Sequence, residues 1–340
     1  MSIKTKVQIL TASSALLLSI LSPSVAFSAT EFKIAVSGSQ GGGQYIVAQE
    51  FADQLKASTD GDYTATLFLN SQLGGEQSTV NDTALGMLDM TIVATNNISP
   101  FSPILGILSL PYLIKTEEEA LKITQSDYMQ NELIDQVAKE AGVRIVAWDY
   151  TGFRAITNSK KPVKNLKDLQ SLKMRVPKSK VLIETWNSWG MNPSPMDWNE
   201  VYTALQQKVV DGQALPIYEV YTENLSESQN HLSKAHYNYL LQPLVISEAI
   251  FQKQPAEIQE KILEAGRKAS LKNNEHALIK EKEAEEKLIE AGVQILSDMD
   301  ESEMQELAMS TVWPKYYNTF GKENIQKILK SLDRENEELP

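Results

Sequence analysis

Short apolar runs alternate with stretches of helical periodicity along the first part of the chain. Residues 31–37, 63–69 and 90–94 have the composition of strands, and residues 44–58 place apolar side chains at helical spacing. A chain in which strands and helices alternate in this way forms parallel strands joined by helical crossovers. The pattern therefore predicts an α/β fold.

Polar loops follow these strands at residues 37–44, 72–76 and 95–97. In parallel sheets ligands bind beyond the carboxyl ends of the strands, so we expect the three loops to form one binding rim. The glycines at 41–43 fit neither a Walker loop nor a GxGxxG fingerprint, which argues against a nucleotide site. Each loop taken alone is also compatible with an ordinary turn.

The rest of the chain predicts a second lobe and a return to the first. The apolar run at 237–247 is most simply a strand that returns to the first lobe, and residues 255–292 form one long charged helix or a broken pair. We find no low-complexity linker, so we expect several chain crossings between the lobes. The other predicted elements are helices at 117–141, 181–189, 201–208, 301–319 and 324–332, and strands at 143–148 and 173–176.

The first 28 residues have the pattern of a secretory signal peptide. Lys4 and Lys6 precede an apolar run at 9–21 and a small-residue site that ends at Ser28. We expect export to the periplasm with cleavage near Ser28 and no stable membrane insertion afterwards; an uncleaved N-terminal anchor is the alternative. Residues 29–340 exceed the usual size of one hydrophobic core, which predicts two lobes.

Composition narrows the choice of partners. The chain has no cysteine, which excludes disulfides, cysteine nucleophiles and thiolate metal sites. Its formal net charge of −12 argues against nucleic acid and anionic membrane surfaces as partners. An acidic protein that binds an anion needs a recessed, locally positive site.

Residues suited to catalysis or metal binding are sparse. His231 and His236 have no partner carboxylate at metal-ligand spacing, and the only other histidine is His276. The chain lacks a GxSxG elbow, an HExxH motif and an SxxK motif with its companions. We therefore expect no metal, no cofactor and no enzymatic activity, with a periplasmic hydrolase as the enzyme alternative.

Residues suited to binding a small anion are better represented. Arg154 and Arg175 lie at the edges of strand-like runs, where a guanidinium is held rigidly and its planar fork matches a carboxylate bidentately. Trp148, Trp198 and Tyr239 offer rings for the apolar face of such a solute. The alternatives are structural ion pairs for the arginines and a core-packing role for Trp198.

Six segments occur in a specific order and spacing: SQLGGE (71–76), LGMLDM (85–90), LPYL (110–113), GFRAITN (152–158), KPVKNLKDLQSLKMRVPKS (161–179) and PMDWNEVYTALQQKVVDGQ (195–213). With these segments the chain resembles the substrate-binding proteins of tripartite ATP-independent periplasmic (TRAP) transporters, of the dicarboxylate (DctP) type. The resemblance covers essentially the whole chain after residue 28.

The resemblance implies a fold and a division into lobes. The fold is an α/β periplasmic-binding-protein clamshell of two lobes, each a mixed sheet flanked by helices, with a long helix that spans both lobes. We expect residues 29–151 and 241–280 in the first lobe, and residues 152–240 and 281–340 in the second. The lobes of such a receptor close on a small organic acid, which is then delivered to a membrane permease driven by an ion gradient.

The resemblance also assigns roles to residues. Arg175 corresponds to the principal carboxylate clamp and Arg154 to a second arginine at the cleft. Trp198 stands where an aromatic ring packs on the ligand. Further expected contacts are the turn residues Pro177 and Ser179, the first-lobe residues Gln44, Glu76, Asn96 and Asn97, and the aromatic Tyr239.

One position departs from the family pattern. After Asp211-Gly212-Gln213 the family continues with glutamate, asparagine and proline, and that asparagine also contacts the carboxylate, whereas this chain has Leu215 there. Leucine cannot donate a side-chain hydrogen bond, so either the two arginines hold the anion with another donor or the acid group of the ligand sits differently.

A ligand-sensing subunit of a membrane kinase has the same fold and is the alternative function.

Overall fold

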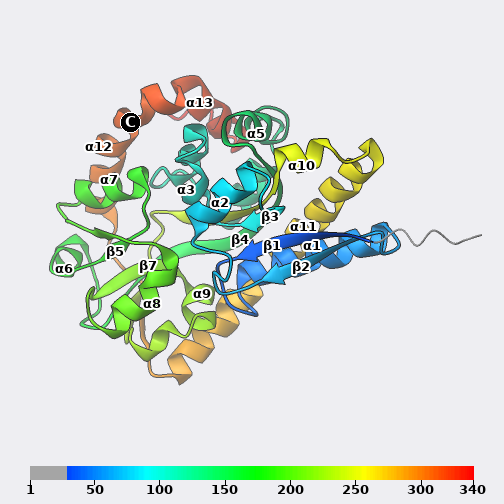
Figure 1. The fold of residues 1–340 in the computed structure, drawn as a ribbon. Helices are drawn as coiled ribbons and strands as arrows, with labels where there is room; N and C mark the ends of the chain where they lie inside the picture. The colour runs from blue at the N-terminus through cyan, green and yellow to red at the C-terminus, as the bar shows by residue number, and fades with distance from the viewer. Residues whose placement is uncertain (1–28) are drawn as a thin grey trace, which may run out of the picture.

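The computed structural model describes residues 29–340, apart from the side chain of Leu278, so the predicted signal peptide lies outside the described residues. Its first strands form a parallel sheet, in which β1 (Thr30–Val36) lies between β2 (Tyr63–Phe68) and β3 (Met90–Ile92) (Figure 1). The helices α1 (Gly43–Ser58) and α2 (Glu76–Ala84) supply the crossovers. The predicted alternation of strand and helix is confirmed.

Two long antiparallel strands extend this sheet through the molecule. β9 (Tyr239–Ser247) pairs with β3 on one side and with β4 (Val143–Asn158) on the other. The second part of β4 pairs with β7 (Gly212–Pro216) and β8 (His231–Ser233), and β8 pairs in turn with β10 (Gln294–Leu296). The strand order is β10-β8-β4-β9-β3-β1-β2, with β7 also on β4. The result is a two-lobed α/β fold whose lobes share β4 and β9.

β4 is much longer than the strand predicted at 143–148. The polar and glycine-containing stretch after Trp148 has the composition of a strand end, but pairing with β9 carries the strand through it. The register shifts between Ile145 and Ala147 and again between Tyr150 and Gly152, and Gly152 has a φ of +114° that favours glycine. Tertiary pairing therefore overrides the local breaks.

The long charged segment forms one continuous helix, α11 (Ala256–Glu290) of 35 residues, and not a broken pair. In Figure 1 it runs from beside α10 (Glu248–Gln252) to the end of the molecule that holds α9 (Ile217–Thr222). It packs on α1 of the first lobe and on α9 of the second. The expectation of a helix that spans both lobes is confirmed.

Side chains of α11 accept hydrogen bonds from the irregular part of β4. Ser270 Oγ accepts from the backbone N–H of Trp148 at 2.8 Å, and Asn273 Oδ1 accepts from that of Tyr150 at 2.9 Å. A buried N–H without a partner is costly, so these side chains satisfy the groups that lie next to the register shifts. The long helix is thereby attached to the strand that the lobes share.

Other elements complete the two lobes. The predicted helix at 117–141 is interrupted because Ser126 takes an extended conformation and its hydroxyl accepts from the backbone N–H of Met129 at 3.2 Å. β5 (Arg175–Val176) and β6 (Ser194–Pro195) form a separate two-stranded sheet. The remaining helices are α3 (Thr95–Ile98), η1 (Pro103–Ser109), α4 (Glu117–Gln125), η2 (Met129–Leu133), α5 (Ile134–Ala141), α6 (Leu166–Gln170), α7 (Lys180–Ser188), α8 (Trp198–Gln206), η3 (Leu225–Glu227), α12 (Ser302–Phe320) and α13 (Lys322–Ser331).

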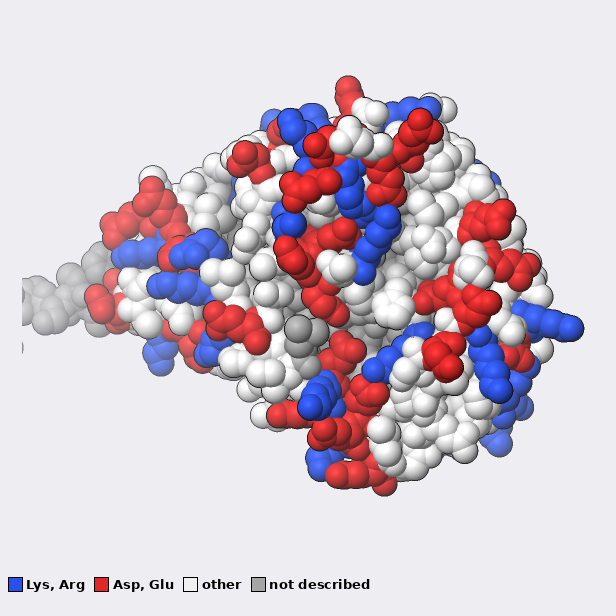
Figure 2. Space-filling view, turned by 180° about the vertical axis from the view of Figure 1, so that it is seen from behind, with Lys and Arg blue, Asp and Glu red and all other residues white. Residues whose placement is uncertain are grey.

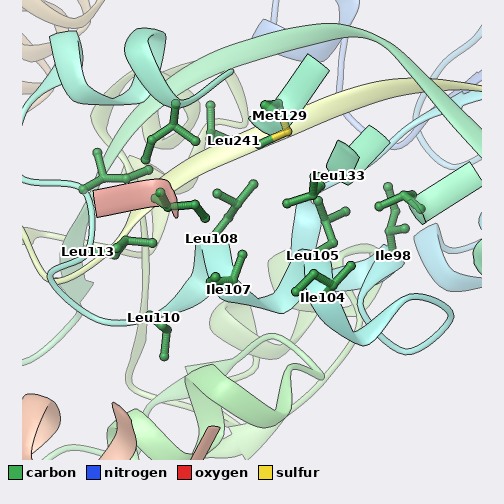
Figure 3. Close-up of a cluster of buried hydrophobic side chains, with 14 of the residues drawn as sticks. Ile98, Ile104, Leu105, Ile107, Leu108, Leu110, Leu113, Met129, Leu133 and Leu241 are labelled. Carbon is green, nitrogen blue, oxygen red and sulfur yellow. The ribbon is translucent and has the colours of Figure 1, made fainter. Parts of the chain in front are cut away.

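The C-terminal helices pack against segments of both lobes. Side chains of α13 and the end of α12 pack in the same hydrophobic cluster as η1, η2 and β4 of the first lobe. Figure 3 shows the η1 and η2 side chains of this cluster, among them Leu105, Leu108 and Leu133, gathered around Leu241 of β9. The amphipathic face of α13 thus packs on first-lobe segments, while Met304 and Ala308 of α12 pack in a second-lobe cluster. The assignment of residues 281–340 to the second lobe stays a prediction.

Gly266 marks the closest approach of α11 to β4. A Cβ at this position would lie 1.8 Å from the carbonyl oxygen of Val146, which is impossible without moving the helix or the strand.

Among the described residues none of the helices is long and apolar enough to cross a membrane.

We predict that Gly266→Ala destabilises the protein although alanine is the better helix former. Overpacking of this kind costs about 1–3 kcal/mol, against a helix-propensity gain of about 1 kcal/mol. Urea unfolding followed by circular dichroism measures the net change, with Lys268→Ala on the exposed face of the same helix as the control. A Gly266→Ala variant at least as stable as the parent would contradict the prediction, because α11 and β4 would then move apart at little cost in free energy.

Candidate ligand-binding site

A cavity of about 550 Å³, including its open mouth, lies between the lobes. The loop after β1 and the segment after β3 line it from the first lobe, as the predicted binding rim required, and β4, β5 and α9 line it from the second. Nine of the predicted contact residues lie on its wall: Gln44, Glu76, Asn96, Asn97, Arg154, Arg175, Pro177, Trp198 and Leu215.

Arg175 is fixed by the small sheet of β5 and β6. Its side chain is 4% exposed, and its Nε and Nη2 donate to the carbonyl oxygen of Met196 at 3.2 and 2.9 Å. The guanidinium carbon lies 6.0 Å from the ring centre of Trp198, within the range of a cation–π interaction. The cation and the ring therefore face the cavity as one unit.

Arg154 is held by the second part of β4. Its Nε donates to Asn238 Oδ1 and its Nη1 to the carbonyl oxygen of Ala214, both at 3.0 Å. The side chain is only 2% exposed, so its orientation is set by neutral acceptors and not by solvent. Asn238 was not singled out in the sequence because nothing local indicates that it faces an arginine.

Neither arginine has a carboxylate within ion-pair distance among residues 29–340. Burial lowers the pKa of Arg154, and burial together with repulsion by Arg154 lowers the pKa of Arg175 to about 9. Two cations held close together in a buried site are unfavourable unless an anion joins them. The alternative of structural ion pairs for these residues is therefore not what the fold contains.

Polar groups of the first lobe form a connected network on the opposite wall. Gln44 Oε1 accepts from the backbone N–H groups of Ser37 and Gly38 at 3.1 and 3.0 Å. Gln44 Nε2 donates to Glu76 at 3.2 Å, and Glu76 also accepts from Ser37 Oγ at 2.8 Å and from Asn97. Burial raises the pKa of the Glu76 carboxyl.

Gln242 connects this network to the second lobe. It lies on β9, accepts from Gln44 Nε2 at 2.7 Å, and its Nε2 lies 3.1 Å from Asp149 Oδ2 and 2.6 Å from Glu219 Oε1. Glu219 is on α9, so one amide spans strand, first-lobe helix and second-lobe helix. We did not predict Gln242 or Glu219, although a glutamine inside the apolar run YNYLLQPLVIS is a signal that could have been used.

Two of the predicted contacts lie off the cavity wall. Ser179 is the N-cap of α7, where its hydroxyl accepts from the backbone N–H of Leu182 at 3.3 Å. Tyr239 packs edge-on against Phe153, with ring centres 5.0 Å apart, in the hydrophobic core. Ser179 is thus occupied by the helix end, and the side-chain alternation of β9 directs Tyr239 away from the face that carries Gln242.

Leu215 lies on the cavity wall and packs in a hydrophobic cluster of the second lobe. It pairs with Ala155 in the β4–β7 ladder, next to Arg154. Asn96 offers a possible replacement donor, since its Nδ2 is buried without a hydrogen-bond partner. The site therefore lacks the family's asparagine but contains another unpaired amide on the first-lobe side.

Contacts across the cleft hold the lobes together at its mouth. Ser39 N and Oγ donate to Glu223 at 2.9 and 3.1 Å, and the Tyr218 hydroxyl donates to the carbonyl oxygen of Gly41 at 2.6 Å. The acceptor or donor lies on α9 or at its end in each case, and the loop after β1 supplies the partner. The glycine-rich loop thus contributes backbone groups to the contact between the lobes.

The described residues contain no group of three or more His, Asp or Glu side chains placed to hold a metal.

Asp149 is a buried carboxylate behind this wall. Its oxygens accept from Gln242, Thr151 and Asn273, and a Cβ on Gly43 would lie 2.5 Å from Oδ2. Burial raises the pKa of Asp149 to about 6, because the hydrogen bonds do not fully offset the lost hydration. The folded state therefore binds a proton more tightly than the unfolded chain.

We predict a pH-dependent stability difference between the parent and Asp149→Asn. Between the unfolded pKa near 4 and the folded pKa near 6 the folded protein holds the extra proton, so stability falls as pH rises through this window. The parent should lose on the order of 2–3 kcal/mol relative to the variant between pH 4 and pH 7. Urea unfolding at several pH values measures this, and parallel curves for the two proteins would contradict it.

Comparison with known proteins identifies the class. Residues 35–319 match the model of the family described as bacterial extracellular solute-binding protein, family 7 (DctP), and the chain belongs to this family. Over 266 residues it is 32% identical to the 2,3-diketo-L-gulonate-binding periplasmic protein YiaO of Escherichia coli K12, covering 77% of this chain and 79% of that protein.

Solved structures show the same architecture. A TRAP periplasmic solute-binding protein from Polaromonas bound to D-erythronate superposes with a TM-score of 0.84 at 27% identity, covering 88% of this chain and 98% of that one. One from Haemophilus influenzae with bound L-gulonate gives a TM-score of 0.83 at 28% identity, covering 89% and 99%. The resemblance drawn from the sequence segments is confirmed at the level of family and fold.

Proposed function

We propose that this protein is a periplasmic receptor that binds a small organic acid between its lobes and delivers it to an ion-gradient-driven TRAP permease. The observation that carries the proposal is the pair of buried arginines, Arg154 and Arg175, on the wall of the interlobe cavity with no carboxylate partner among residues 29–340. A ligand carboxylate is the anion that such a pair lacks. Relatives that bind diketogulonate, erythronate and gulonate support the same ligand class.

The fold provides a mechanism for capture. The lobes share β4 and β9, and the contacts of the β1 loop with α9 form across the cavity mouth. A ligand that touches both walls favours the closed arrangement by the free energy of those contacts. The receptor then presents a closed surface to the permease. Export with signal cleavage near Ser28 is part of the proposal.

Acidic and basic side chains are interspersed on the face of the molecule shown in Figure 2, so the surface has no large area of one sign on this side. In this proposal the positive charge that binds the ligand is that of the recessed arginines, in a chain whose formal net charge is −12.

We predict that Arg175→Ala loses most of the affinity for a bound sugar acid. Removing one member of a desolvated charge pair costs about 2 kcal/mol or more, equivalent to about a 30-fold rise in Kd. The Kd of Arg175→Lys should fall between those of the parent and Arg175→Ala, because lysine keeps the positive charge but cannot bind a carboxylate bidentately. Isothermal titration calorimetry against erythronate and gulonate measures the change.

The matched control is Arg267→Ala, which removes an exposed arginine paired with Glu264 on α11 and should leave binding unchanged. Thermal unfolding without ligand checks that each variant is folded. Arg175→Ala with parent-like affinity would refute the clamp, and failure of the parent to bind any carboxylate would refute the proposed function.

A further inference from the structure

The cavity wall carries charged residues of both signs. Lys178 and Asp197 neutralise each other at 2.8 Å. Of the others, Arg154 and Arg175 are the cations, and the acidic set consists of Glu76, Glu219 and Glu223. Within the described part of the chain none of these five forms an ion pair within 4 Å, although all line one cavity. The site therefore holds both signs of charge without direct ion pairs, although Arg154 attracts Glu76 and Glu219 at longer range.

The acidic set faces the cavity from both lobes. Glu76 comes from the first turn of α2, while Glu219 and Glu223 come from α9 and its end. Glu223 is occupied at the mouth by Ser39, and Glu76 accepts from three first-lobe side chains. Glu219 has one hydrogen bond, from Gln242 to its Oε1, so its other acceptor sites remain to be filled.

A second ligand carboxylate at this wall would be strongly unfavourable. Burial raises the pKa of Glu219 well above its usual range, and repulsion by Asp149 and Glu223 adds to the rise, which Arg154 and the Gln242 hydrogen bond only partly oppose. The Gln242 amide is already shared among Asp149, Thr151 and Glu219, so it has no free proton to offer another oxygen. Next to Glu219 the Gln242 amide therefore offers no spare donor, and the unpaired Asn96 Nδ2 lies on the first-lobe side of the cavity.

We propose that Glu219, together with Glu76, makes the receptor specific for acids whose far end carries hydrogen-bond donors, hydroxyl or ammonium, and that this wall rejects a second carboxylate. This inference rests on the proposed function, because the arginines must first fix the near carboxylate. A donor group satisfies the open acceptors of Glu219, whereas a methyl group leaves them unpaired and a carboxylate repels them.

The middle of the site agrees with such a ligand. Leu215, Leu240 and Trp198 line the cavity and offer carbon surface to the chain of the ligand. The cavity wall thus combines three kinds of group: two cations, apolar side chains and carboxylate acceptors. A dicarboxylate matches only the first of these groups.

The test uses acids of equal length: 4-aminobutanoate, succinate and butanoate differ only at the far end, and erythronate adds hydroxyls at carbons 2, 3 and 4. Erythronate carries hydroxyls, 4-aminobutanoate an ammonium, succinate a carboxylate and butanoate a methyl group. Calorimetry with the parent should give a Kd for erythronate or 4-aminobutanoate at least tenfold lower than for butanoate, and succinate should bind no better than butanoate. The same comparison with gluconate, 6-aminohexanoate, adipate and hexanoate covers a longer ligand. The first two compounds of each set distinguish a hydroxyl from an ammonium requirement.

Glu219→Gln keeps the shape of the side chain, removes its ability to ionise and replaces one acceptor oxygen by an amide donor. In this variant the ratio of the succinate Kd to the erythronate Kd, or of adipate to gluconate, should fall at least tenfold. Glu286→Gln makes the same charge change on the exposed face of α11 and should leave the ratio unaltered. Thermal unfolding confirms that both variants fold.

The outcomes separate the two proposals. Parent protein that binds the diacids as tightly as the donor-bearing acids, or a Glu219→Gln variant with an unchanged ratio, overturns the specificity role while leaving the receptor function intact. Failure of the parent to bind any acid of either set overturns the proposed function and this inference with it. Loss of binding in Arg175→Ala with an altered ratio in Glu219→Gln supports both.

Discussion

The antiparallel pairing of β4 with β9 is the interaction on which the rest of the structure depends. These strands run through both lobes and place Asp149, Arg154 and Gln242 along the inner side of the cleft. Because both strands belong to both lobes, the relative position of the two cavity walls is set by their bend and register. The register shifts at Ile145 and Tyr150 are stabilised by side chains of α11, which ties the long helix to the same hinge.

The cavity shows how an acidic protein can hold an anion. The two arginines are oriented by the neutral carbonyls of Ala214 and Met196 and by Asn238, and their charge is left without a carboxylate partner in the described chain. Burial and mutual repulsion make this arrangement of two cations costly. In the proposed receptor a ligand carboxylate offsets this cost, so the repulsion between the arginines contributes to the affinity.

The opposite wall follows the same principle with acceptors. Buried carboxylates that are not paired with cations stay in the site because amides such as Gln44 and Gln242 position them and because a ligand donor can complete their hydrogen bonding. A cavity that holds both unpaired cations and unpaired carboxylates sets more requirements on its ligand than a pair of arginines alone. In the specificity proposed above, the ligand has a defined direction, with its acid group at the arginines and its donors at α9.

Local pattern and motif were enough to identify the parallel β1–β3 sheet, the long charged helix, the family, and nine wall residues including both arginines. These features are encoded in short stretches, where hydrophobic period, strand-end loops and ordered segments are directly visible. Ser179 and Tyr239 show where such reasoning stops, since a residue near a pocket in sequence can be used as a helix cap or turned into the core by strand alternation.

Tertiary structure alone decided the full length of β4, the first-lobe packing of α13, and the meeting of Gln242 with Glu219. Each depends on contact between segments far apart in the chain. A strand continues through glycine when a partner supplies the hydrogen bonds, an amphipathic helix packs where an apolar surface is available, and a buried carboxylate is defined by neighbours that no local pattern identifies. The sequence by itself therefore predicted the two cavity arginines, Arg154 and Arg175. The grouping of Gln242 with Glu219 is determined only by the tertiary structure.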